Sequence, residues 1–134
     1  MVNIADFEKI SAELKELIGL EGSPVAVKIA VSPEDIPEGI PEIEETTRHC
    51  RMVSLAREGQ VFYATDAKHQ CGGGAWALGL REKGATLKTG QHYFKLGKYE
   101  TINASRRTME GVPSLTQESY ATIYAPLEKA NFEP

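Results

Sequence analysis

The amino-acid sequence predicts an α/β or α+β fold, with a small central sheet and flanking helices. The chain has 134 residues, the usual size of one domain, with 41% hydrophobic and 25% charged residues, as in ordinary globular proteins. Short runs rich in β-branched residues alternate with segments of helical periodicity. We therefore expect residues 1–134 to form a single domain.

The first expected element is an amphipathic helix over residues 3–18. Its apolar side chains recur every three or four positions, at Ile4, Phe7, Ile10, Leu14 and Leu17. Asn3 or Asp6 could cap the start of this helix, and Gly19 or Gly22 could end it. A β-branched run bounded by prolines then predicts a strand at residues 25–31. The acidic, proline-containing residues 32–45 predict a solvated connection without a regular element.

The middle of the chain predicts a helix over residues 46–57, capped by Thr46 or Thr47 and closed by Gly59. A second strand is expected at residues 60–65. A loop that carries Cys71 follows it, and a short helix is expected at residues 75–80.

Glycines divide residues 81–113 into short pieces, so this part of the sequence predicts little regular structure. Within it, residues 91–96 and 102–109 have helical character. The alternating, β-rich residues 120–125 predict a last strand, which Pro126 ends.

Charge and hydropathy exclude several classes of partner. The net charge is −4 and the sequence pI is about 5.4, which argues against nucleic-acid binding. The longest apolar stretches are too short to cross a membrane, and the N-terminus lacks the basic and apolar regions of a secretory signal. We therefore expect a cytoplasmic protein without nucleic-acid or membrane partners, in which cysteines remain thiols or ligands.

Cys50, the first of the two cysteines, lies in the basic sequence Arg48-His49-Cys50-Arg51. Neighbouring cations favour the thiolate, which is the form that binds metals and attacks electrophiles. The alternative is that Cys50 is a small buried hydrophobic residue beside Val53.

Cys71 directly precedes Gly72, Gly73 and Gly74, which have no side chains to block access to the sulfur. Consecutive backbone amides and the start of the following helix would favour a thiolate there. The same arrangement suits a small anion. The alternative is a tight glycine turn that lets Trp76 pack, with Cys71 incidental.

Two cysteines are too few for a four-thiolate zinc or iron–sulfur site within one chain. His49 and His69 could complete a set of four ligands, although His49 directly adjoins Cys50. A homo-oligomer would bring four cysteines together around a symmetry axis. Alternatively, Cys50 and Cys71 could form a redox pair within one chain.

Several short motifs, taken in order, resemble the domain-of-unknown-function family 169. They are residues 23–28 (SPVAVK), 48–50 (RHC), 55–59 (LAREG), 71–75 (CGGGA), 77–80 (ALGL), 126–128 (PLE) and 132–134 (FEP). The family's cysteines fall on Cys50 and Cys71, and its glycine run falls on Gly72–Gly74. The family is uncharacterised, occurs mainly in anaerobic bacteria and archaea, and is generally longer. The resemblance thus implies a short or truncated member, lacking a C-terminal portion, in a setting compatible with iron–sulfur chemistry.

These observations lead to one preferred function and two alternatives. The preferred function is binding of a metal or iron–sulfur centre through Cys50 and Cys71 in a homo-oligomer, for electron transfer, sensing or cofactor handling. The cofactor would be an iron–sulfur cluster or zinc. The alternatives are a thiol redox enzyme with Cys71 as nucleophile, or a non-catalytic module that binds a small anion. The residues expected to contact such a small-molecule ligand are Gly72, Gly73, Gly74, Arg48, His49 and His69.

Overall fold

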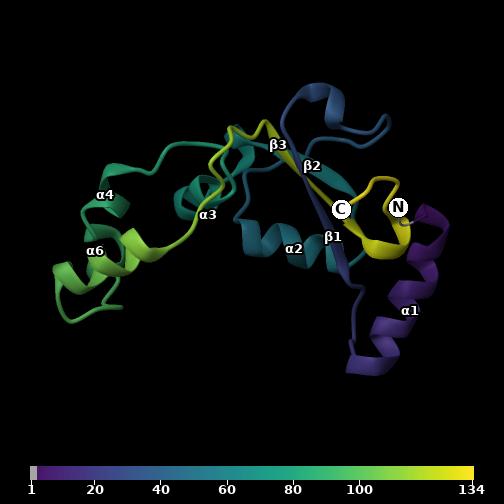
Figure 1. The fold of residues 1–134 in the computed structure, drawn as a ribbon, viewed down its shortest axis with the longest axis horizontal. Coiled ribbons are helices and arrows are strands. Elements are labelled where there is room, and N and C mark those ends of the chain that lie inside the picture. The colour runs from purple at the N-terminus through teal and green to yellow at the C-terminus, as the bar shows by residue number, and fades with distance from the viewer. Residues whose placement is uncertain (1–2) are drawn as a thin grey trace.

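A three-stranded antiparallel sheet forms the centre of the protein, whose computed structural model describes residues 3–134 (Figure 1). The strands are β1 (Val25–Ala30), β2 (Phe62–Thr65) and β3 (Ala121–Pro126). Their order is β1-β3-β2, so the strand that comes last in the sequence lies in the middle and pairs with both others. Helices flank this sheet, which confirms the predicted α/β or α+β class with a small central sheet.

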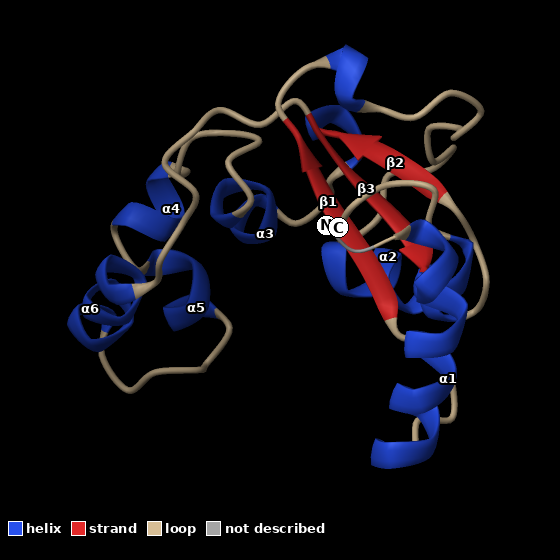
Figure 2. Ribbon diagram, turned by 45° about the vertical axis from the view of Figure 1, so that its right-hand side comes forward, coloured by secondary structure: helices blue, strands red, loops and turns tan. Residues whose placement is uncertain are grey.

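Strand β3 is buried on both faces, and its alternate side chains serve two separate cores. Ile123 belongs to one core, together with Phe7 and Phe132 from the two terminal parts of the chain. Tyr124 belongs to the other core, where it packs with Met52 and other residues of the face covered by helix α2 (His49–Arg57). The sheet is thus the middle layer between α2 and the terminal segments (Figure 2).

Helix α1 (Phe7–Ile18) follows a short 3-10 helix, Ile4–Asp6, and packs against the 3-10 helix η4 (Leu127–Lys129) that follows β3. It ends at Gly19, whose φ of 65° is readily adopted only by glycine. The helix predicted over residues 3–18 is therefore confirmed. Asp6 occupies the N-cap position without a side-chain capping hydrogen bond.

Glu128 ties η4 to α1. Its carboxylate accepts hydrogen bonds from Ser11 Oγ at 2.8 Å and from Ser23 Oγ, and it lies 3.5 Å from Lys15 Nζ. Burial raises the pKa of Glu128, but the hydrogen bonds from Ser23 and Ser11 and the charge of Lys15 outweigh it, and the pKa falls to about 2.

The low pKa of Glu128 predicts an acid-dependent loss of stability. An unfolded glutamate titrates near 4.5, so Glu128 stabilises the fold above that pH, and this contribution disappears as the pH falls towards 2. We expect the melting temperature of Glu128→Gln to depend less on pH than that of wild type between pH 5 and about 2.5. Thermal melts of both proteins across this range test the prediction, with the exposed Glu13→Gln as the control. Parallel curves for wild type and Glu128→Gln would contradict it.

Helices α4 (Ala85–Lys88), α5 (Gln91–Lys95) and α6 (Ile102–Gly111) pack mainly on one another. They form a small unit, here called the α4–α6 unit, on the opposite side of the sheet from α1 (Figures 1 and 2). Helix α3 (Gly72–Ala77) lies between this unit and the sheet. The molecule is consequently elongated and arched.

Several element boundaries differ from the sequence-based expectation. Residues 32–45 contain a 3-10 helix, Pro33–Asp35, in which Ser32 and Asp35 form a capping box. Helix α2 begins at His49 with Arg48 as its N-cap, so the predicted capping by Thr46 or Thr47 is wrong. Helix α3 begins at Gly72 rather than near Ala75, and α4 was not predicted.

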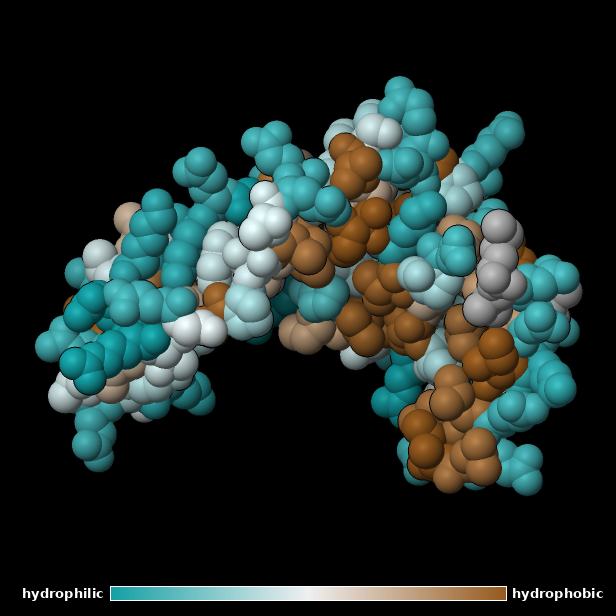
Figure 3. Space-filling model, in the orientation of Figure 1, coloured by the Kyte–Doolittle hydropathy of each residue, from teal (hydrophilic) through white to brown (hydrophobic). Residues whose placement is uncertain are grey.

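Hydrophobic side chains concentrate over the centre of the molecule and along α1, whereas the α4–α6 unit presents a mainly hydrophilic surface in the view of Figure 3. Near the end of α1, Leu17 and Ile18 are 79% and 65% exposed. Within residues 3–134, none of the helices has both the length and the apolar character that crossing a membrane requires.

Candidate functional site

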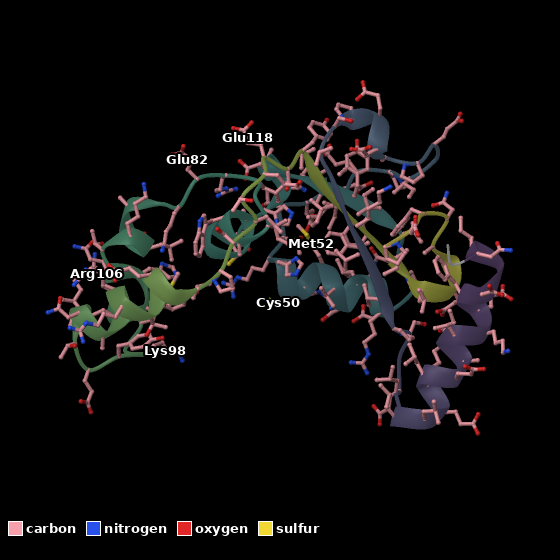
Figure 4. The ribbon with its side chains drawn as sticks, in the orientation of Figure 1. Cys50, Met52, Glu82, Lys98, Arg106 and Glu118 are labelled. Carbon is pink, nitrogen blue, oxygen red and sulfur yellow. The ribbon has the colours of Figure 1, made fainter. Side chains whose placement is uncertain are left out.

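The two cysteines lie in the first turns of neighbouring helices. Cys50 is the second residue of α2 and is exposed, so its interpretation as a buried hydrophobic residue is wrong. Cys71 is the N-cap of α3 and is half-buried. Figure 4 shows Cys50 at the start of α2, whereas Met52 lies on the side of that helix that faces the sheet.

Gly74 is where the two helices meet. A Cβ atom placed on Gly74 would lie 3.5 Å from Cβ of His49 and 3.7 Å from Sγ of Cys71. His49 and Cys71 therefore both lie against this one glycine, and Cys50 directly follows His49 in the chain. These distances are ordinary van der Waals contacts, and they place the first turn of α3 beside the start of α2.

The glycine run forms the first turn of α3 instead of the open loop expected from the sequence. Within this turn, Gly74 N–H donates to Sγ of Cys71 at 3.4 Å, and Ala75 N–H donates to the Cys71 carbonyl. One amide of the run is thus directed at the sulfur. Sγ of Cys71 therefore accepts the kind of hydrogen bond that an N-cap side chain accepts from the first turn of its helix. That amide is already engaged by the chain's own side chain, which weakens the alternative of a small-anion site at Gly72–Gly74.

The basic residues around Cys50 differ in what they contact. The backbone carbonyl of Arg48 accepts hydrogen bonds from the amides of Arg51 and Met52 at the start of α2. Arg48 itself is exposed. The Arg51 guanidinium forms an ion pair with Glu58 at 3.0 Å. The charge of Arg51 is therefore balanced by the carboxylate of the residue that follows α2.

The ring of His49, the first residue of α2, stacks on the ring of His69, and the two ring centroids are 6.4 Å apart. His49 Nδ1 is 2.8 Å from the hydroxyl of Tyr124, and His69 Nε2 is 3.0 Å from Oγ1 of Thr122. His69 is buried, and Nδ1 of its ring has no hydrogen-bond partner within residues 3–134. The two histidines thus connect the cysteine region to the central strand.

Sequence reasoning found both histidines but missed their partners on β3. Thr122 and Tyr124 are two residues apart, so they project from the same face of the strand, towards α2. Polar groups at alternate positions of an otherwise apolar strand were the available signal. Arg81 was missed too: its guanidinium pairs with Asp66 and donates to the carbonyl of His69 at 3.0 Å.

Burial and, after it, the charge of the neighbouring His49 lower the pKa of His69 to about 4. An unfolded histidine takes up its proton near pH 6.5. The neutral His69 therefore stabilises the fold fully above pH 6.5, and this stability is lost as the pH falls from 6.5 towards 4.

We expect wild type to lose stability between pH 7 and pH 4.5 more steeply than His69→Gln, because glutamine has no proton to take up. Urea unfolding at several pH values measures the effect. The exposed His92→Gln on α5 is the control and should retain the slope of wild type. Equal slopes for wild type and His69→Gln would show that His69 does not carry the pH dependence.

No group of three or more histidine, cysteine, aspartate or glutamate side chains within residues 3–134 is arranged to hold a metal ion. The thiols, the histidine pair and the glycine run are nevertheless concentrated around the first turns of α2 and α3. This region, here called the two-helix site, consists of His49, Cys50, His69, Cys71 and Gly74.

Comparison with known proteins shows which family the chain is related to. The family model DUF169, described as "Uncharacterised ArCR", matches residues 13–134, which include the whole two-helix site. The chain is 41% identical over 135 residues to "Uncharacterized protein MJ0308" of Methanocaldococcus jannaschii. That alignment covers 99% of the chain but only 58% of the archaeal protein. No solved structure matches the chain. The chain therefore belongs to the domain-of-unknown-function family 169.

Proposed function

We propose that the protein binds a metal ion or an iron–sulfur centre through Cys50 and Cys71, for electron transfer, sensing or cofactor handling. The observation that supports this proposal is that both thiols lie in the first turns of α2 and α3, which are adjacent at Gly74. Thiolates are the ligands of such centres, and a helix start favours the thiolate form.

Two thiols need further ligands, and a second copy of the chain is the simplest source. A symmetric dimer would add two more cysteines, and the exposure of Cys50 leaves its sulfur accessible to a neighbouring subunit. His49 is an additional candidate, because Tyr124 occupies its Nδ1 and would orient the ring so that Nε2 binds.

Anaerobic purification followed by iron, zinc and sulfide analysis tests the proposal. Wild type should retain metal and form a dimer, whereas Cys50→Ser and Cys71→Ser should each lose most of the metal and shift towards monomer. His92→Ala, which removes a histidine outside the two-helix site, should behave like wild type. Metal-free wild-type protein, or cysteine variants with an unchanged metal content, would refute the proposal.

A second candidate function is thiol redox chemistry with Cys71 as the nucleophile and Cys50 as the resolving thiol. The hydrogen bond from Gly74 N–H to Sγ of Cys71 favours it, because such a bond stabilises a thiolate. In the Cys50→Ser background, Cys71 should then react with iodoacetamide faster at neutral pH than Cys50 does in the Cys71→Ser background. Alkylation of Cys71 that is no faster than that of Cys50 would count against this candidate.

A further inference from the structure

A pocket lies where α3 meets the α4–α6 unit. Its volume is about 430 Å³, within the size range of small-molecule sites. Aromatic side chains from three different segments line it: Trp76 of α3, Tyr93 of α5 and Tyr99 of the loop that follows α5. Met109 of α6 contributes further apolar surface. Pockets at the junction of two structural units are common ligand sites.

The glycine run helps to make this pocket. Gly73 forms part of its wall, and a Cβ atom placed there would lie 3.6 Å from the hydroxyl of Tyr93. The bare backbone at Gly73 thus leaves room beside the tyrosine. Gly73 and Gly74 are consecutive, so the pocket and the two-helix site lie on either side of the same turn of α3.

Lys83 stabilises the Trp76 wall of the pocket. Its Nζ lies 4.5 Å from the centre of the indole ring and donates a 2.6 Å hydrogen bond to the carbonyl of Met109. One lysine therefore connects the tryptophan of α3 to the backbone of α6. The cation–π contact and the hydrogen bond restrain the aromatic surface against which a ligand could pack.

The charge of the lining indicates which ligands the pocket favours. Lys98 contributes a cationic group, and the described lining contains no carboxylate to balance it. Figure 4 shows Lys98 on the lower side of the α4–α6 unit, whereas Arg106 lies on its outer side. Half-buried aromatic rings suit a planar ring, and an ammonium group suits an acidic substituent.

We propose that this pocket binds a planar aromatic molecule that carries an acidic group, such as an aromatic carboxylate. The ring packs between Trp76, Tyr93 and Tyr99, and the acid pairs with Lys98. This binding requires no metal and no thiol, so it is independent of the function proposed for Cys50 and Cys71.

Trp76, the only tryptophan of the chain, reports on binding. The probes are 2-naphthoate and its uncharged counterpart 2-naphthamide, titrated into ¹⁵N-labelled protein while the single indole N–H resonance is followed. Both probes should shift this resonance saturably, and naphthoate should bind more tightly. The Cys50→Ser/Cys71→Ser double variant should bind as wild type does, which separates this result from the metal analysis.

Variants then locate the site. Tyr99→Ala should weaken binding of both probes roughly tenfold, and Thr108→Phe, which adds bulk at the exposed rim, should also weaken both. Lys98→Met should weaken naphthoate about threefold and leave naphthamide unchanged. The matched controls are Phe94→Ala and Lys95→Met, which alter α5 outside the pocket and should change neither affinity.

Three outcomes would overturn the proposal. The first is the absence of a saturable shift with either probe at millimolar concentration. The second is binding that Tyr99→Ala and Thr108→Phe leave unchanged in protein of native circular dichroism, because the probe would then bind elsewhere. The third is equal binding of cyclohexanecarboxylate and naphthoate, which would refute the aromatic class.

Discussion

Replacing Gly90 by alanine is expected to disrupt the α4–α6 unit and to lower the free energy of unfolding by about 3 kcal/mol. Gly90 has a φ of 80° and packs against the backbone of α6. A Cβ atom there would lie 2.5 Å from the backbone nitrogen of Arg106 and 2.7 Å from the carbonyl oxygen of Ile102. Backbone atoms cannot rotate away as a flexible side chain can, so α5 and α6 must separate.

The buried Ser105 reinforces this contact, because its hydroxyl donates to the Gly90 carbonyl at 2.6 Å. Gly97→Ala provides the matched control: its φ is 68°, but a Cβ atom there would meet nothing within 4 Å. Backbone strain alone then costs about 1 kcal/mol. Urea unfolding and hydrogen exchange of the α6 amides distinguish the two variants. Equal losses of stability in both variants would show that the close contact between Gly90 and the backbone of α6 does not determine the effect of Gly90→Ala.

Ile123→Ala is expected to lower the free energy of unfolding by about 2 to 5 kcal/mol. Ile123 is fully buried at the middle of β3, pairs with Lys28 of β1 and Tyr63 of β2, and packs in the core that Phe7 and Phe132 share. Removing its side chain leaves a cavity where the central strand and both terminal segments meet.

The control for Ile123 is Val31→Ala, which removes apolar atoms from a side chain that is 53% exposed just after β1. Its expected cost is below about 0.5 kcal/mol, because most of the removed surface is already in contact with water. Chemical denaturation midpoints of the two variants measure the difference. Similar midpoints would contradict the assignment of Ile123 to the core.

Local pattern predicted most elements of this fold but not their arrangement. The amphipathic period of α1 and the β-branched run of β1 are properties of neighbouring residues, so they are visible in the sequence. The start of α2 is not. Thr47 looked like a helix cap, yet its backbone pairs with the segment around His69, which holds it in an extended conformation until Arg48.

At helix α3 the error is the reverse, because a segment predicted as a loop is helical in the structure. Consecutive glycines are poor helix formers, so the sequence predicts a loop at Gly72–Gly74. In the structure, Gly73 faces Tyr93 and Leu87, and Gly74 faces His49 and Cys71. Close tertiary packing on both sides of this turn, which only long-range contacts reveal, stabilises the helical conformation.

The residue types of the candidate site were predictable from the sequence, but the hydrogen bonds that join them to the sheet were not. The basic surroundings of Cys50 and the glycines after Cys71 identified both thiols as candidates. The polar partners of His49 and His69 are Tyr124 and Thr122, far away in the sequence. They lie close because β3 is the central strand, and hydrophobic periodicity carries no information about the order of strands.

The central position of β3 also determines when the domain can fold during its synthesis. Strands β1 and β2 each pair with β3 and are made well before it. On the ribosome, β1 and β2 therefore cannot form their hydrogen bonds with β3 until residues 121–126 have left the exit tunnel. The sheet therefore closes late, and long-range pairing of this kind is slow and exposes strand edges to aggregation. During that interval the nascent β1 and β2 segments are where a chaperone would be needed.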